Sequence, residues 1–223
     1  LGKYILLMIQ DFKRPAKGKV FWGQLLNEFQ KLGVESLGIV AIISAFMGAV
    51  LAMQVSFNID SPLISPLLIG FTVRQSVILE FAPTVISLIL AGKVGSRIAS
   101  EIGTMRVTEQ IDALQILKTD PIDYLVIPRV IACALMLPLL NVLSFITGMT
   151  GGLLIATNQY GIPYSVFLDS AKNFLSIWDL VSSLIKAFFF GNINPNIGTN
   201  RGLTTTGGAK GAGLAVLHGA SRR

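Results

Sequence analysis

Two long stretches of the chain carry no charged residue, and they restrict the fold to one built in a membrane. The first runs from Ser36 to Phe57, 22 residues, and the second from Val130 to Leu168, 39 residues. About 20 apolar residues are enough for a helix to cross the hydrocarbon core of a bilayer. Only 13% of all residues are charged, about half the share in an ordinary soluble domain. The sequence therefore predicts an all-α fold, a polytopic bundle of membrane helices.

These stretches and their neighbours indicate about four membrane spans. The first is Ser36–Phe57, and a second apolar run covers Gln75–Gly92. The 39-residue stretch is longer than one crossing needs. We therefore expect a long third span, kinked near Pro138, followed by an external segment with a short helix that ends by Asn173. A weaker fourth span is expected over Phe174–Gly191.

Small side chains recur at intervals of four along the first span. They form two rows on adjoining faces, Ala41, Ala45 and Ala49 in one and Ser44, Gly48 and Ala52 in the other. Small residues allow two helices to approach closely in lipid. The rows therefore predict a packed helix–helix interface on this span.

A few charges and a proline interrupt the later spans. Proline at position 83 removes a backbone donor and tends to kink a helix, and a carboxylate at membrane depth usually faces protein or a water-filled cavity. Glu80 is therefore expected either to line a pocket, to form a buried pair with Arg74, or to lie solvated near the outer interface. Asp179 and Lys186 lie seven residues apart on one helical face, which predicts partial pairing between them.

Residues 1–35 are expected to form a cytoplasmic or interfacial helical segment. Apolar residues at helical spacing define one face of a helix: Phe21, Leu25, Phe29 and Leu32. Because a membrane span follows at once, we expect this helix to lie in the interface plane with its basic residues toward headgroups. An ordinary helix packed in a core is the alternative.

Basic residues are distributed unevenly among the connections between spans. Six Lys or Arg residues precede Ser36, and five lie between Lys93 and Arg129, whereas the two expected external connections contain only Lys172. The positive-inside rule then predicts a cytoplasmic N-terminus and a cytoplasmic 93–129 connection. The net charge of +6 is explained by this anchoring, so nucleic acid is not expected as a partner.

A charged segment, Glu101–Leu114, lies between the second and third apolar runs. Charges are costly in hydrocarbon, so a segment of this kind is kept in water. Val107, Ile111 and Leu114 recur at i, i+4 and i+7, which predicts a short amphipathic helix within residues 103–118. Its charged surface suits docking with a fixed orientation. A solvated helical hairpin that binds nothing is the alternative.

Small residues also precede this segment. Gly95, Ala99 and Gly103 form a further row at intervals of four. We therefore expect the second span to continue beyond the bilayer and to join the docking helix closely. Movement of the span would then be transmitted to that helix.

Three motifs in this region carry a family resemblance. They are Leu90-Ala-Gly-Lys-Val-Gly-Ser96, the charged segment itself, and Asp120-Pro121. Nearly residue for residue from Ala91 to Asp120, the chain resembles MlaE/YrbE permeases, the membrane subunits of MCE-linked ABC transporters of lipids. Two looser resemblances cover Lys13–Phe57, similar to the interfacial helix and first span of the family, and Lys186–Gly213, similar to its last cytoplasmic turn.

The resemblance implies a function and a set of partners. In the family, the charged segment is the coupling helix that sits in a groove of a cytoplasmic ABC ATPase. The corresponding residues here are Glu101, Arg106, Glu109, Gln110, Asp112 and Leu114. The resemblance further implies a second permease copy, an MCE-domain periplasmic protein, and movement of phospholipid between the bacterial inner and outer membranes, which maintains outer-membrane lipid asymmetry. The permease would be non-catalytic and without a cofactor, because the partner subunit binds and hydrolyses ATP.

A lipid cavity is expected near the outer ends of the first two spans. Its lining is predicted from position along the chain. The candidate residues are Met47, Leu51, Leu67, Leu68, Phe71, Val77 and Glu80.

The C-terminal part departs from the family pattern. Members continue with an apolar fifth span, whereas Ala215–Arg223 is short and ends in Ser-Arg-Arg. Four asparagines lie where the family is apolar, and we expect them to shorten the fourth span from the inside: Asn192, Asn194, Asn196 and Asn200. We therefore expect three parts: segment 1–35, a permease domain 36–195, and a cytoplasmic Gly/Thr-rich tail 196–223 in place of the final span.

No enzymatic motif stands out in the sequence. The single histidine, His218, is in the tail, the single cysteine, Cys133, is in an apolar run, and Gly207–Gly213 lacks P-loop spacing. Two other functions remain open. One is a membrane scaffold that docks a soluble partner without transport, and the other is a secondary transporter, which the lack of an internal repeat disfavours.

Overall fold

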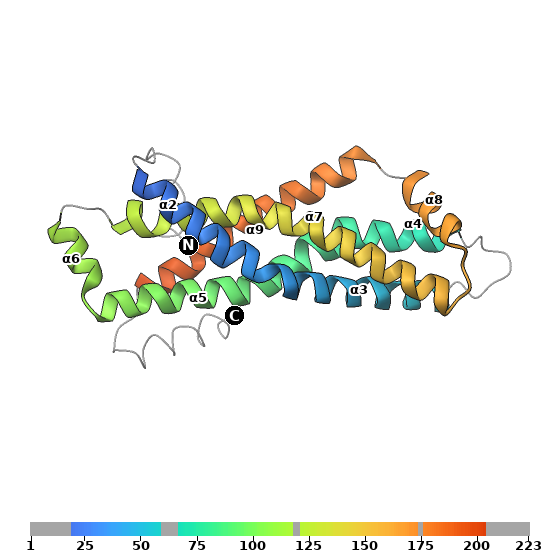
Figure 1. Cartoon of the computed structure of the whole chain (residues 1–223), viewed down its shortest axis with the longest axis horizontal. Helices are drawn as coiled ribbons and strands as arrows, with labels where there is room; N and C mark the ends of the chain where they lie inside the picture. Colours follow the sequence, from blue (N-terminus) through green and yellow to red (C-terminus); the bar gives the residue numbers. More distant parts are fainter. Residues whose placement is uncertain (1–18, 59–66, 118–120, 174–175, 204–223) are drawn as a thin grey trace. The chain divides into compact units, whose positions relative to one another are not determined.

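The computed structural model describes residues 19–58, 67–117, 121–173 and 176–203, and every element in these ranges is helical (Figure 1). The longer elements are α2 (Lys19–Glu28), α3 (Leu37–Asn58), α4 (Leu67–Ser76), α5 (Ile86–Val107), α6 (Gln110–Ile116), α7 (Ile127–Asn158), α8 (Tyr164–Asn173) and α9 (Ile177–Leu203). Shorter helical segments connect some of them: η1 (Phe29–Gly33), η2 (Val34–Ser36), η3 (Val77–Val85) and η4 (Ile122–Val126). Of these, η1, η3 and η4 are π-helical and η2 is a 3₁₀ turn.

Three helical stretches are long and apolar enough to cross a membrane. They cover residues 21–58, 67–107 and 124–158, and a fourth candidate arises when α8 and α9 are counted together. The prediction of an all-α polytopic bundle with about four spans is confirmed, and the chain is a multi-pass membrane protein. The second span begins earlier than expected, because α4 already starts at Leu67. The third passes through Pro138, which lies inside α7.

The residues form two compact units, which are described separately. One contains residues 1–35, 88–136 and 189–223 and is called the α6 unit; the other contains residues 36–87 and 137–188 and is called the α8 unit. Several sequence-based expectations lie outside the described residues. They concern residues 1–18, the connection 59–66, Lys118–Asp120 and the tail from residue 204 onward, including His218.

The α8 unit is built around one apolar core. Helix α4 lies against α3 and α8, and a Cβ added at Gly70 would stand 2.8 Å from the Phe167 carbonyl oxygen of α8. The backbones of α4 and α8 are therefore in close contact. The buried core consists of Leu51, Ala52, Ile69, Val73, Val77, Ala156, Ile162 and Phe167.

The predicted small-residue interface on the first span is present in this unit. Ser44, Gly48 and Ala52 are buried, and they face α7. The Ser44 hydroxyl donates to the Ser144 hydroxyl at 2.8 Å. A Cβ at Gly48 would overlap the carbonyl oxygen of Gly148, so the two helices touch through their backbones. The second row, with Ala41, Ala45 and Ala49, is half-buried.

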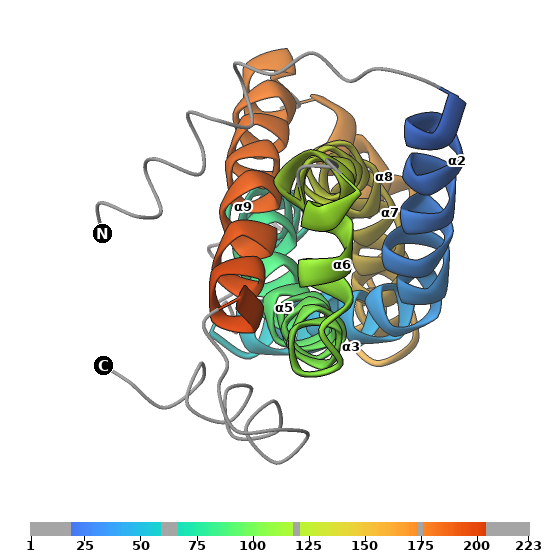
Figure 2. The ribbon, with the colours of Figure 1, turned by 90° about the vertical axis from the view of Figure 1, so that its left-hand side faces the viewer.

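The α6 unit contains α2, α5, α6 and the adjoining ends of α7 and α9 (Figure 2). Glycines on α9 bring it close to its neighbours. A Cβ at Gly191 would stand 2.7 Å from the Cys133 carbonyl oxygen of α7, and one at Gly198 would stand 2.8 Å from the Gly95 carbonyl oxygen of α5. Small residues therefore determine helix approach in this unit as well.

The asparagine-rich stretch does not shorten the last helix, which corrects the expectation drawn from composition. Helix α9 continues to Leu203, beyond the boundary at residue 195 between the predicted domains. Asn192, Asn196 and Thr199 are buried on its inner side, and the Asn196 amide donates to the Asn192 carbonyl at 2.8 Å. These polar side chains lie inside the unit. The composition of the segment cannot predict this, because it does not show which face of the helix is buried.

Candidate functional site

The short helix expected within residues 103–118 is divided in the structure, because the second span extends into it and a sharp turn separates the two parts. Helix α5 ends at Val107, and α6 begins at Gln110. Glu109 at the turn has φ 57°, in the left-handed region, and its amide donates to the Arg106 carbonyl at 3.3 Å. The amphipathic spacing could not reveal this break, because Val107 and Ile111 keep helical spacing across it.

The apolar residues of α6 divide into a buried base and an exposed tip. Ile111 is 2% exposed, and Leu114 is half-buried. Ile116 and Leu117, by contrast, are 82% and 74% exposed. Large exposed apolar side chains beside polar ones are typical of a surface that binds another protein. Neither Ile116 nor Leu117 is among the residues predicted from the sequence to contact the ATPase.

The predicted charged residues of this segment have different surroundings. Across the turn, Arg106 Nη1 lies 2.9 Å from Asp112 Oδ1, and both side chains are about half exposed. Glu109 and Gln110 are exposed. Arg106 and Asp112 therefore hold the two sides of the turn together, while the other two side chains are accessible at it.

Glu101 belongs to a buried ion-pair cluster on the inner side of α5. Arg129 of α7 donates through Nη2 to Glu101 at 2.8 Å and through Nε to Glu28 of α2 at 3.2 Å. The Arg129 and Glu28 side chains are 8% and 11% exposed, and that of Glu101 is 33% exposed. One guanidinium therefore joins three helices. Sequence reasoning missed this cluster because its members are far apart in the chain.

The cluster continues along α5 toward the start of the first span. Arg97 lies 3.4 Å from Glu101 and 2.6 Å from Glu35. Lys93 Nζ donates to the Glu35 carbonyl at 2.7 Å. Helix α5 is thus tied by polar contacts to the segment that connects α2 and α3.

Substitutions at Glu109 are expected to reveal the strain of the turn. Valine there should destabilise the protein by about 1–2 kcal/mol, because a β-branched residue resists the left-handed conformation. Glycine should leave the stability unchanged or raise it, because glycine adopts this conformation freely. Thermal unfolding of the detergent-solubilised protein measures both effects. Gln110→Gly is the matched control within α6, with an expected loss of about 1 kcal/mol; equal losses for Glu109→Gly and Gln110→Gly would contradict the prediction.

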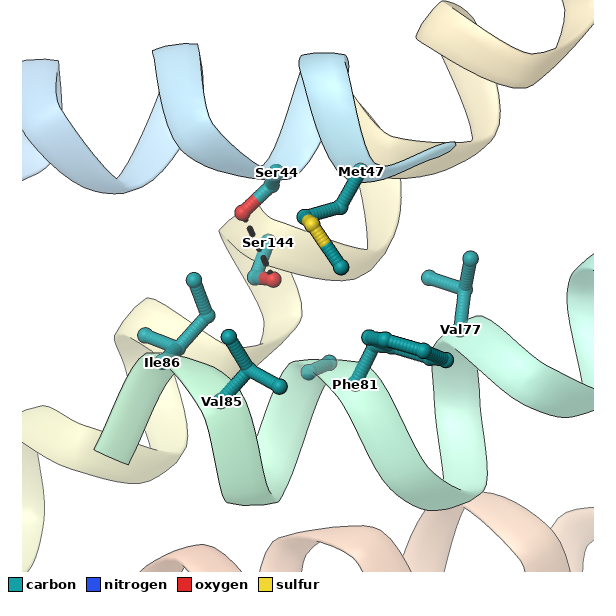
Figure 3. A pocket seen from close by; sticks show the side chains of 8 residues that line it. Ser44, Met47, Val77, Phe81, Val85, Ile86 and Ser144 are labelled. Atoms are coloured by element: carbon teal, nitrogen blue, oxygen red, sulfur yellow. Dashed lines mark hydrogen bonds between the residues drawn. The ribbon is translucent and has the colours of Figure 1, made fainter. Parts of the chain in front are cut away.

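A second candidate site is a small cavity in the α8 unit (Figure 3). It is lined by Ser44, Met47, Val77, Phe81, Ala82, Val85, Ile86 and Ser144. Its volume is about 10 Å³, which is about what one water molecule requires. The hydrogen bond between the two serines lies at its polar end. The cavity is therefore far smaller than a phospholipid.

Two of the seven predicted pocket residues, Met47 and Val77, line this cavity. Leu51 belongs to the apolar core, and Leu67 and Leu68 are exposed. Phe71 lies under the Arg74 guanidinium, 5.2 Å from its ring centre, and Glu80 is exposed. The structure thus brings Met47 and Val77 together and distributes the others over the surface and core of the unit.

The charges of the second and fourth spans are paired differently from the sequence-based expectation. Arg74 lies 3.9 Å from Asp179, and Lys186 lies 3.6 Å from Glu80. Of the placements expected for Glu80, the buried pair with Arg74 is wrong, whereas its 66% exposed side chain agrees with the solvated alternative. The expected pair Asp179–Lys186 is also wrong. Each charge pairs with a residue on the neighbouring helix, because α9 runs parallel to α4 and η3. Arg74 and Glu80 are six residues apart, and their partners Asp179 and Lys186 are seven residues apart, so both pairs can form.

Metal-binding side chains are not gathered in the described part of the chain. Within it, no group of three or more His, Cys, Asp and Glu residues could hold a metal ion. Cys133 is buried in α7 with a free thiol.

The apolar helices define a multi-pass α-helical membrane protein, and the α5–α6 turn adds an exposed helical hairpin. Comparison with known families identifies it further, because the family described as Permease MlaE matches residues 25–221. The chain therefore belongs to the MlaE permease family, as the resemblance had predicted.

Named relatives agree with this assignment. A probable ABC transporter permease protein of Synechocystis is 46% identical over 92% of this chain and 77% of its own length. One of Porphyra purpurea is 38% identical over 96% and 81%. The chloroplastic protein TRIGALACTOSYLDIACYLGLYCEROL 1 of Arabidopsis thaliana is 40% identical over 90% of this chain, which spans only 57% of that protein.

Proposed function

We propose that this chain is the permease subunit of an ABC transporter that moves phospholipid between the inner and outer membranes of a bacterium. A separate cytoplasmic ATPase binds α6 and supplies the energy, so the permease is itself non-catalytic and needs no cofactor. The names of the relatives support an ABC permease. The Arabidopsis relative carries the name of a diacylglycerol lipid, which supports a substrate with two acyl chains.

The observation that carries the proposal is the exposed apolar tip of α6. Ile116 and Leu117 are almost fully exposed at the end of a helix whose base is buried through Ile111. In water such a tip is unfavourable unless a partner covers it. The exposed Glu109 and Gln110 add polar contacts that would set the register of docking. In this arrangement the docking surface is positioned by Glu101, Arg106, Asp112 and the half-buried Leu114.

The transported lipid needs more space than one copy of the chain offers. The cavity of the α8 unit has a volume of about 10 Å³, whereas pockets for drug-sized ligands measure about 300–1,000 Å³. We therefore propose that a second permease copy completes the lipid cavity. The predicted residues that face outward contribute from each copy, namely Leu67, Leu68 and Glu80. An MCE-domain protein on the periplasmic side receives or delivers the lipid, and the N-terminus is cytoplasmic.

Charge placed on the α6 tip should release the ATPase. Ile116→Glu and Leu117→Glu are each expected to reduce co-purification with the ATPase subunit about tenfold or more, as for central apolar residues of other interfaces. The matched control is Ser100→Glu, an exposed position on α5. A detergent pull-down followed by an ATPase assay measures both properties.

The same preparations distinguish the alternatives. Phospholipid should stimulate ATP hydrolysis by the parent complex, and the tip variants should lose this stimulation. Docking without any lipid stimulation would indicate a scaffold, and transport that depends on an ion gradient would indicate a secondary transporter. Unchanged co-purification of both tip variants would exclude α6 as the docking element.

A further inference from the structure

The first turn of α9 carries two large apolar side chains that are exposed on the α8 unit. Ile177 is 80% exposed and Trp178 is 73% exposed, and they begin the helix that contributes to the fourth candidate span. Trp178 is one of two tryptophans in the chain. Because a large exposed apolar surface marks a place where something other than water is bound, the two side chains need an occupant.

The other side of α9 in this unit is polar and faces the neighbouring helices. Three side chains at helical spacing each have a partner on another element: Asp179, Ser183 and Lys186. Asp179 lies 3.9 Å from Arg74 of α4, and the Ser183 hydroxyl accepts a hydrogen bond from the Asn141 amide of α7 at 2.8 Å. Helix α9 is therefore polar toward the protein and apolar on its free side, the reverse of a helix at a water-exposed surface.

Exposed apolar residues continue along the free side of α9. Val181 and Ile185 follow Trp178 at intervals of three and four residues, and they are 37% and 48% exposed. Helix α8, in contrast, exposes polar side chains, among them Ser165, Asp169 and Lys172. Charged side chains are costly in hydrocarbon. The surface therefore changes from one suited to water to one suited to lipid between α8 and the start of α9.

The Arg74–Asp179 pair lies at the level of this change, because Asp179 directly follows Trp178. Tryptophan is enriched at membrane–water interfaces, where its ring contacts acyl chains and its N–H reaches polar groups. Charged residues of a span are most costly at the centre of the bilayer, so an ion pair is better placed near the headgroups. The tryptophan and the ion pair therefore indicate the same depth.

We propose that Ile177 and Trp178 form a membrane anchor at the boundary between the headgroups and the acyl chains of one leaflet, where α9 enters the hydrocarbon. The occupant of this surface is phospholipid, because the exposed apolar row of α9 continues directly from it. The anchor fixes the depth of α9 and keeps the Arg74–Asp179 pair at the level of the headgroups. None of these steps depends on the proposed transport function.

Quenching by brominated lipids measures the depth of Trp178. In the Trp22→Phe variant of the full chain, Trp178 is the single tryptophan. After reconstitution into phosphatidylcholine vesicles, bromine close to the headgroup should remove about half of the fluorescence or more, as for an indole at the interface. Bromine close to the ends of the acyl chains should remove less.

Tryptophans placed elsewhere on the unit are matched controls in the background Trp22→Phe, Trp178→Phe. Ile185→Trp moves the indole about 10 Å further along the same side of α9, so bromine close to the acyl-chain ends should quench it more strongly than bromine close to the headgroup. Ser165→Trp on the exposed side of α8 should be quenched only weakly by either lipid.

Three results would overturn the proposal. Stronger quenching of Trp178 by the acyl-end bromine would place it deeper than the boundary, and no quenching by either lipid would show that water or protein covers it. Strong quenching of Ser165→Trp would place α8 itself in lipid. If Trp22→Phe does not accumulate, the difference between the parent chain and Trp178→Phe gives the same measurement. Because no ATPase takes part, failure here is distinct from failure of the proposed function.

Discussion

Gly48→Leu is expected to prevent accumulation of folded protein, and Gly48→Ala is expected to cost about 3 kcal/mol or more. A single added methyl at this position would overlap the Gly148 carbonyl oxygen of α7. The obstacle is backbone and not the end of a flexible side chain, so a local rotamer change does not relieve it. The two helices would have to separate, which would also break the hydrogen bond between Ser44 and Ser144.

The matched control lies on the same helix. A Cβ at Gly38 meets no atom within 4 Å, so Gly38→Ala should be neutral or favourable by up to about 1 kcal/mol, the difference in helix propensity. The fraction of monodisperse protein after heating in detergent measures both variants. Equal stability of Gly48→Ala and Gly38→Ala would show that α3 and α7 do not meet as described.

Arg129→Met is expected to destabilise the α6 unit by about 3–5 kcal/mol, because it leaves two carboxylates without their buried cation. Glu28 would lose its partner inside the unit, where its side chain is 11% exposed. Glu101 would keep only its longer contact with Arg97, at 3.4 Å. Thermal unfolding in detergent measures the loss.

Two further variants test the cause of this loss. Arg106→Met removes a cation from an exposed pair in the same unit and should cost only about 0–1 kcal/mol. Adding Glu28→Gln to Arg129→Met should recover part of the stability, because it removes one of the isolated charges. If Arg129→Met were as mild as Arg106→Met, the buried cluster would not stabilise the unit.

The spans and their close packing were predictable because their signals are local. Charge-free stretches and the repeat of small residues at Ser44, Gly48 and Ala52 can be recognised without knowing which helix lies opposite. The cost of placing charges in hydrocarbon and the need for close helix approach apply to any membrane helix. The predicted span and its close packing are therefore found in the structure, as α3 and its interface with α7.

The charge pairs were not predictable because several arrangements satisfy the same sequence. Arg74, Glu80, Asp179 and Lys186 offer two ways to pair opposite charges, and spacing along each helix favours the pairs within a helix. The observed pairs depend on α9 running parallel to α4 and η3. The Arg129 cluster depends likewise on three helices meeting around one side chain.

The candidate docking site was predicted in part. The charged segment and its buried residue Ile111 followed from amphipathic spacing, whereas the turn at Glu109 and the exposed tip with Ile116 and Leu117 did not. A left-handed residue other than glycine has no reliable sequence signal. The exposure of Ile116 and Leu117 depends on how far α6 extends beyond its contact with the rest of the unit, which the sequence does not show.

By itself, the sequence determined that this protein is a multi-pass membrane permease of the MlaE family, because hydrophobicity, small-residue spacing and motif identity are properties of continuous segments. Only the tertiary structure decided which charges pair, that Asn192 and Asn196 of α9 are buried, and that the Arg129 guanidinium joins three helices. Each of those outcomes depends on distances between residues far apart in the chain. Such distances are set by the order, direction and rotation of packed helices, which no single segment encodes.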